Sequence, residues 1–132
     1  MNKPILYQEH ILDHYKNPRH KGSLQDAHFT TALYNPSCGD SILFQGIVQD
    51  GKLVDIAFEG SGCVISLATA SLLSELVLHK PLHEIINFTA DTVQHLIQIS
   101  LGPQRLKCAL LPLEALQKGI RDYLKEQHAE SL

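Results

Sequence analysis

The stretch from Ser41 to Glu59, SILFQGIVQDGKLVDIAFE, carries the clearest fold signal in the chain. It consists of two apolar runs, Ser41 to Val48 and Leu53 to Glu59, on either side of Asp50-Gly51. A type I′ turn requires positive φ at both central residues, which Asp-Gly adopts readily, so the pattern predicts a β-hairpin. With this turn at the tip, the predicted facing pairs on one largely apolar face are Leu43 and Phe58, Gln45 and Ile56, and Ile47 and Val54.

The segments on both sides of the hairpin predict one more strand and several helices. Phe29 to Tyr34 reads as a strand, and apolar periodicity predicts helices at 7–15, 66–79, 82–87 and 89–99, the last with Thr89 as N-cap. We expect one long helix through Cys108, bent near Pro112, with an apolar stripe of Leu113, Leu116, Ile120 and Leu124. A chain of 132 residues is predicted to form a single α+β domain, residues 1–132.

Three cysteines, Cys38, Cys63 and Cys108, occur in a chain whose first residues form no apolar signal core. An odd number of cysteines without an export signal favours metal binding or thiol chemistry over a disulfide framework. Cys38 and Asp40 are two residues apart in Asn35-Pro36-Ser37-Cys38-Gly39-Asp40. Because extended residues at this spacing point to the same face, we expect a sulfur and an oxygen to be offered to one ion.

A second and a third thiol are candidates for the same site. The hairpin leads from Cys38 to Cys63, which directly precedes a predicted helix N-terminus, where the macrodipole favours a thiolate. With Cys108 these residues make a set of three sulfurs and one oxygen, which suits zinc, copper(I) or an iron–sulfur cluster. Lys107 is a candidate for stabilising a thiolate. Because the spacing matches no CxxC pattern, the alternative that the cysteines are small buried core residues stays open.

Several functional classes are disfavoured by composition. The net charge is −3 with neutral histidines, and there is no basic stripe with interleaved aromatic residues, so a nucleic-acid partner is not expected. No apolar run approaches the roughly 20 residues that span a bilayer, so neither a membrane span nor export is expected and the cytoplasm is the predicted compartment. No histidine is tied by sequence to a cysteine, which argues against a thiol hydrolase.

Three segments match known motifs: NPSCGD at 35–40, GSGC at 60–63 with the Ser/Ala-rich helix after it, and RLKC at 105–108 followed by ALL. A fourth is DHYKNP at 13–18. Together they resemble the IscU/SufU family of iron–sulfur cluster assembly proteins, also described as NifU N-terminal-like. The resemblance extends over nearly the whole chain.

This resemblance implies an α+β sandwich in which a three-stranded antiparallel sheet packs against helices. It implies a scaffold, rather than an enzyme, that accepts sulfur from a cysteine desulfurase, assembles a [2Fe–2S] cluster and transfers it to apo-proteins. Carried over by motif, Cys38, Cys63 and Cys108 would be the sulfur ligands, with Cys63 or Cys108 accepting sulfur. Asp40 would keep the cluster labile, and in the cluster-free protein the same four residues would hold zinc.

Two departures from the family pattern affect the expected partners. IscU proteins have a histidine before the third cysteine and a Leu-Pro-Pro-Val-Lys chaperone motif, whereas this chain has Lys107 and LGPQR at 101–105. Lysine before the cysteine is the SufU pattern, although the SufU insertion between the second and third cysteines is missing. The departures argue against a dedicated Hsp70-type chaperone. They leave two alternatives: a zinc-dependent sulfurtransferase that activates the desulfurase, and a domain with purely structural zinc.

Overall fold

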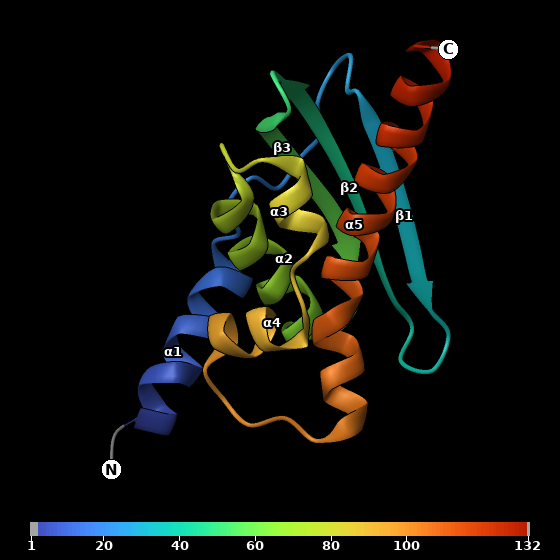
Figure 1. Cartoon of the computed structure of the whole chain (residues 1–132). Helices are drawn as coiled ribbons and strands as arrows, with labels where there is room; N and C mark the ends of the chain where they lie inside the picture. The colour runs from blue at the N-terminus through green and yellow to red at the C-terminus, as the bar shows by residue number, and fades with distance from the viewer. Residues whose placement is uncertain (1–2, 132) are drawn as a thin grey trace.

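A three-stranded antiparallel sheet, with helices packed against one of its faces, forms the framework of the computed structural model, which describes residues 3–131 (Figure 1). The sheet has the order β1-β2-β3, with β1 at Phe29–Asn35, β2 at Asp40–Gln49 and β3 at Lys52–Ser61. The helices are α1 (Lys3–Lys16), α2 (Val64–Val77), α3 (Leu82–Ile86), α4 (Ala90–Ile97) and α5 (Pro103–Ser131). The predicted α+β class and three-stranded sheet are therefore confirmed.

The hairpin between β2 and β3 has the predicted turn. Asp50 and Gly51 have φ of 54° and 74°, as a type I′ turn requires. Val48 pairs with Leu53, but the next pair is Ile47 with Asp55. Within the described sheet Val54 is thus the extra residue of a β-bulge, which shifts the register of all the following pairs by one.

The bulge makes the predicted hairpin pairs wrong beyond the turn. Phe44, not Leu43, lies opposite Phe58, and their ring centroids are 5.9 Å apart. The even-numbered residues of β2, from Asp40 to Val48, are buried, while the odd-numbered ones are partly exposed or exposed. A shift of one residue exchanges the two faces of a strand. Asp40, at the start of β2, is in phase with the buried Val48 and points into the protein, and the bulge brings Ile56 and Phe58 of β3 to this same buried face.

Helix α5 packs across β1 and β2 and closes the main core (Figure 1). It continues through Pro112 as one helix, as predicted, and Leu113, Leu116 and Ile120 of the predicted stripe are buried. Leu124, the last of the stripe, is 37% exposed. None of the helices within residues 3–131 is long and apolar enough to cross a membrane.

A buried polar cluster connects helix α2 to α1 and to Arg19, which lies in the segment after α1. His14 Nδ1 lies 2.8 Å from Ser71 Oγ, which also accepts the backbone N–H of Arg19 at 2.8 Å. Ser74 donates to the carbonyl of Arg19 at 3.1 Å. Burial lowers the pKa of His14, which favours the neutral ring. This cluster fixes α2, whose N-terminus carries Cys63.

Candidate metal centre

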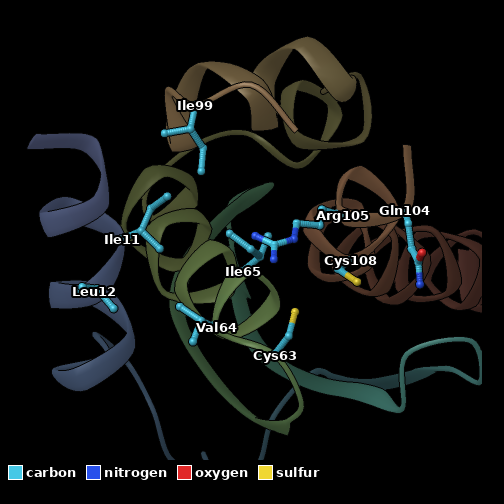
Figure 2. A pocket seen from close by; sticks show the side chains of 9 residues that line it. All are labelled: Ile11, Leu12, Cys63, Val64, Ile65, Ile99, Gln104, Arg105 and Cys108. Carbon is cyan, nitrogen blue, oxygen red and sulfur yellow. The ribbon is translucent and has the colours of Figure 1, made fainter. Parts of the chain in front are cut away.

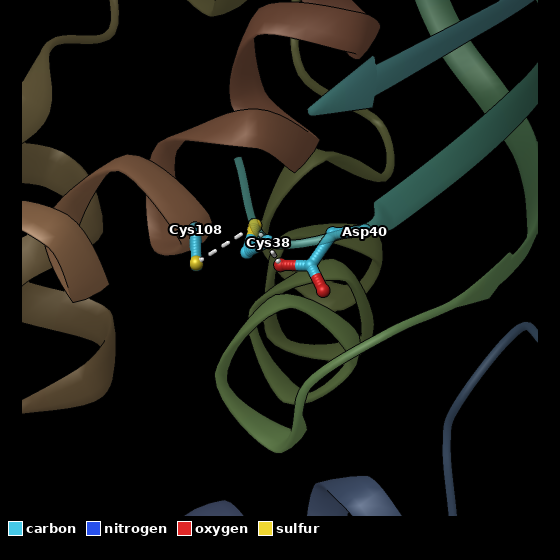
Figure 3. A group of neighbouring side chains, drawn as sticks. All are labelled: Cys38, Asp40 and Cys108. Atoms are coloured by element: carbon cyan, nitrogen blue, oxygen red, sulfur yellow. Dashed lines mark hydrogen bonds between the residues drawn. The ribbon is translucent and has the colours of Figure 1, made fainter. Parts of the chain in front are cut away.

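The three cysteines and Asp40 meet where the β1–β2 loop, the start of α2 and the first turns of α5 come together. The thiol of Cys38 donates to Asp40 Oδ2 at 3.0 Å, and the thiol of Cys108 lies 3.2 Å from the sulfur of Cys38 (Figure 3). Cys63 Sγ is 3.4 Å from the same carboxylate oxygen. The structure therefore brings Cys38, Asp40 and Cys108 into one group of ligand atoms, and Cys63 joins this group through its contact with Asp40.

The carboxylate of Asp40 is held in one orientation. Its Oδ1 accepts the backbone N–H of Cys63 at 2.8 Å, which leaves Oδ2 directed towards the sulfurs. Gly62 makes this contact possible: its φ is 137°, and a Cβ at this position would overlap Oδ1 of Asp40. A glycine is required here both for its backbone conformation and for the close approach.

Asp40 is fully buried and nevertheless ionised. Burial by itself raises the pKa of its carboxyl group. Hydrogen bonds from Ser66, from the Cys38 thiol and from the Cys63 N–H outweigh this effect and lower the pKa to about 2. Hydrogen bonds to the charged form stabilise a buried carboxylate in this way. At neutral pH the site therefore offers a charged oxygen beside three sulfurs.

The three thiols differ in their access to solvent. Cys63 is exposed, Cys38 is intermediate and Cys108 is buried. Cys63 is also the N-cap of α2, where its sulfur accepts the backbone N–H of Ser66 at 3.5 Å. Burial, followed by contacts with Cys38 and Asp40, raises the pKa of Cys108. Cys63 is thus the thiol most accessible to a reagent from outside.

Ser66 belongs to the site, although its sequence context predicts only a position in a helix. Its side chain is fully buried, and its hydroxyl lies 2.5 Å from Asp40 Oδ2 and 3.0 Å from the carbonyl oxygen of Cys108. Its position three residues after Cys63 could have indicated that Ser66 lies near the site, because the N-cap residue and the third residue of a helix face each other.

A pocket of about 690 Å³ opens beside Cys63 and Cys108 (Figure 2). The side chain of Arg105 extends from α5 across this pocket towards α2. Lys107, the predicted thiolate stabiliser, lines a different pocket together with Tyr34 and Glu114. Most of the residues around the thiol pocket are apolar: Ile11, Leu12, Val64, Ile65 and Ile99, with Gln104 and Arg105 as the polar members.

The donor set decides which metals suit this site. Thiolates select zinc or iron–sulfur clusters, and a carboxylate oxygen is a harder ligand than a fourth sulfur. The ligand atoms of Cys38, Asp40 and Cys108 all lie within 4.8 Å of one another, close enough to contact a single ion. The residues present therefore fit a zinc ion or a small iron–sulfur cluster.

Comparison with known protein families gives a match along almost the whole chain. The model of the NifU-like N-terminal domain matches residues 6–130. The iron–sulfur cluster assembly scaffold protein IscU of Aquifex aeolicus is 37% identical over 123 residues, which cover 92% of this chain and 78% of that protein. The zinc-dependent sulfurtransferase SufU of Bacillus subtilis is 35% identical over 137 residues, covering 90% and 92%.

Solved structures agree with these matches. A candidate SUF-system scaffold protein from Fervidobacterium islandicum has a TM-score of 0.77 at 26% identity, covering 88% of this chain and 97% of that one. A NifU-like N-terminal domain from Brucella abortus, at 19% identity and a TM-score of 0.75 over 90% and 94% of the two chains, shares the fold. The chain therefore belongs to the NifU-like N-terminal domain family, together with the IscU and SufU proteins.

Proposed function

We propose that this protein is an iron–sulfur cluster assembly scaffold whose cluster is held by Cys38, Asp40, Cys63 and Cys108. The observation that carries the proposal is the convergence of three sulfurs on one buried, ionised carboxylate, with Cys38 and Cys63 at 3.0 and 3.4 Å from Asp40 Oδ2. Family membership supports it, since relatives over 30% identical are named as scaffold proteins.

The ligand set favours a [2Fe–2S] cluster that is assembled and then given away. Two irons need four terminal ligands in such a cluster, and four candidates are present. A carboxylate oxygen is a poorer partner for iron–sulfur chemistry than a thiolate, so the Asp40 bond is the one expected to exchange. This makes the cluster cargo rather than a permanent cofactor, and apo iron–sulfur proteins are its proposed recipients.

Sulfur is proposed to enter through Cys63 from a cysteine desulfurase. The thiolate of Cys63 would attack the outer sulfur of the desulfurase persulfide, forming a new S–S bond while the desulfurase thiolate leaves. Cys63 is favoured over Cys108 because it is exposed and borders the pocket, whereas Cys108 is buried. Lys107 stays a candidate for stabilising the Cys108 thiolate, although its own side chain lines the neighbouring pocket.

Anaerobic reconstitution tests this proposal. Purified protein is incubated with a cysteine desulfurase, cysteine and ferrous iron, and visible absorption, iron and acid-labile sulfide are measured. A cluster that forms and then moves to an apo-ferredoxin is the expected result. Failure of Cys38→Ala or Cys63→Ala to reduce cluster formation would contradict the proposed ligands.

A second candidate is a zinc-dependent sulfurtransferase that activates the desulfurase. Lys107 directly before Cys108, and the similarity to SufU of Bacillus subtilis, favour this function. The same four residues would then hold zinc in the resting protein, and a thiolate released from zinc would accept the sulfur. If zinc remains bound during reconstitution, no cluster forms and desulfurase turnover rises only with the intact zinc site, this second function is the correct one.

A further inference from the structure

Ser66 contacts three of the four proposed ligands: Asp40 in β2, Cys63 directly before α2, and Cys108 in α5. Its hydroxyl is 2.5 Å from Asp40 Oδ2 and 3.0 Å from the carbonyl oxygen of Cys108, and its backbone N–H donates to the sulfur of Cys63 at 3.5 Å. A serine hydroxyl carries one proton and can make one full donation at a time. The two acceptors, a carboxylate and a carbonyl, therefore compete for one proton inside the protein.

Pro112 explains why the carbonyl of Cys108 is available to Ser66. In an α-helix each carbonyl accepts the N–H of the residue four positions later. For Cys108 this residue is Pro112, which lies inside α5 and has no N–H. The proline thus removes the helical donor of the Cys108 carbonyl, and the hydroxyl of Ser66 supplies another from α2.

We propose that Ser66 is a positioning residue that controls how readily Asp40 exchanges as a metal ligand. When Asp40 Oδ2 is engaged by a metal, the Ser66 hydroxyl donates to the Cys108 carbonyl that Pro112 leaves without its helical donor. When Asp40 leaves the metal, the hydroxyl turns back to Oδ2. Rotation of one hydroxyl thus moves its single donation from one buried acceptor to the other as Asp40 leaves or binds the metal. The inference rests on the proposed function.

The direction of the effect follows from the two hydrogen bonds. A hydrogen bond to a carboxylate is charge-assisted and stronger than one to a carbonyl. Ser66 therefore stabilises the released Asp40 more than the metal-bound one, and its hydroxyl promotes exchange. A residue that only oriented Asp40 would act in the opposite direction, since loss of an orienting hydrogen bond weakens metal binding.

The test uses Co²⁺ as a spectroscopic probe of the site, with affinity and release rate measured by chelator competition. Ser66→Ala is expected to bind Co²⁺ about tenfold more tightly than wild type and to release it more slowly. Ser74→Ala is the matched control, because it removes another buried hydroxyl of α2 whose partners, the carbonyls of Arg19 and Ser71, lie away from the site. The control should bind like wild type.

Pro112→Ala tests the competition between the Cys108 carbonyl and Asp40 for the hydroxyl proton of Ser66, without removing Ser66. It returns an N–H to the Cys108 carbonyl, so the hydroxyl is free to stay on Asp40, and weaker, faster-releasing Co²⁺ binding is expected. It also keeps the proposal testable if Ser66→Ala does not fold. In an Asp40→Ala background the effect of Ser66→Ala should disappear, which a purely structural role of Ser66 would not produce.

Three results would overturn the inference. One is weaker Co²⁺ binding by Ser66→Ala, and another is an unchanged Ser66→Ala effect in the Asp40→Ala background. The third is a Pro112→Ala variant that shifts binding in the same direction as Ser66→Ala. Failure of the proposed function looks different: the wild-type protein itself would then not bind Co²⁺ through its thiols, and the characteristic sulfur-to-cobalt absorption would be missing.

Discussion

Helix α2 contributes to two polar clusters. The groups of one can exchange protons for a metal ion, whereas the groups of the other keep fixed hydrogen bonds. At its N-terminus Ser66 faces an ionised carboxylate and thiols, whose protons are lost when a metal binds. Further along, Ser71 and Ser74 bind a backbone N–H, a backbone carbonyl and the neutral ring of His14. The first cluster is suited to changing partners, and the second to holding α1 in place. One helix thus joins an exchangeable site to a fixed anchor.

The largest expected effect of breaking the exchangeable cluster is on metal binding. Cys63→Ala should lower zinc affinity by more than about 100-fold, because loss of even an indirect partner of a metal ligand costs up to about that much. Chelator competition measures this. Ser71→Ala, in the fixed cluster, is the matched control and should bind zinc normally. Equal affinities of Cys63→Ala and wild type would show that the two clusters do not differ as described.

The close approach at Gly62 gives the next largest effect. Gly62→Ala places a methyl group against Asp40 Oδ1 at a φ of 137° and is expected to destabilise the protein by about 3 kcal/mol. Gly51→Ala is the control, since its φ of 74° is also positive but no described atom lies within 4 Å of the added Cβ. It should cost about 1 kcal/mol. Urea denaturation measures both, and similar losses would mean that Asp40 moves aside freely.

The fixed cluster is tested by removing its central hydroxyl. Ser71→Ala leaves the N–H of Arg19 and Nδ1 of His14 without their partner and should cost about 2 kcal/mol of stability. The free energy of unfolding is obtained by urea denaturation of the metal-free protein. A variant as stable as wild type would indicate that water replaces the hydroxyl and that the anchor is weaker than its burial suggests.

The smallest expected effect is a pH dependence that comes from His14. Burial lowers the pKa of His14 in the folded protein below that of the unfolded chain, near 6.5, so the unfolded chain binds more protons between these two values. Stability is therefore complete above about pH 6.5 and decreases as the pH falls towards the folded pKa, by at most about 1.4 kcal/mol per pH unit. His14→Gln should flatten this slope in urea denaturation across that range.

Most of the fold was predictable because local signals agree with tertiary packing. Asp50-Gly51 gave the hairpin turn, and Thr89 is the N-cap of α4 as predicted. The register was not predictable, since a bulge at Val54 has no strong sequence signature, and only the structure shows that it brings Phe58 opposite Phe44. A one-residue error of this kind reverses a strand's faces, which is why the predicted apolar face was wrong.

The candidate site was predictable in its sulfur and carboxylate groups but not in the residues that support them. Cys38, Asp40 and Cys63 were found because thiols and motif resemblance are visible in a sequence. Ser66 was missed because one serine in a helix rich in serine and alanine carries no signal alone. The proposed role of Ser66 depends on Pro112, which lies four residues after Cys108. The spacing matters only because α5 runs unbroken through both residues, so that Pro112 is the missing helical donor of the Cys108 carbonyl.

The wide separation of the three cysteines along the chain has a consequence for the lifetime of the protein. A metal bound to all three would cross-link the β1–β2 loop, the start of α2 and the start of α5, and would close a loop that contains α2, α3 and α4. A ligand that binds the folded chain but not the unfolded chain raises the free energy of unfolding. A bound metal or cluster would then protect the scaffold against proteolysis. After each transfer of the cluster, the empty protein would be degraded faster than the loaded one.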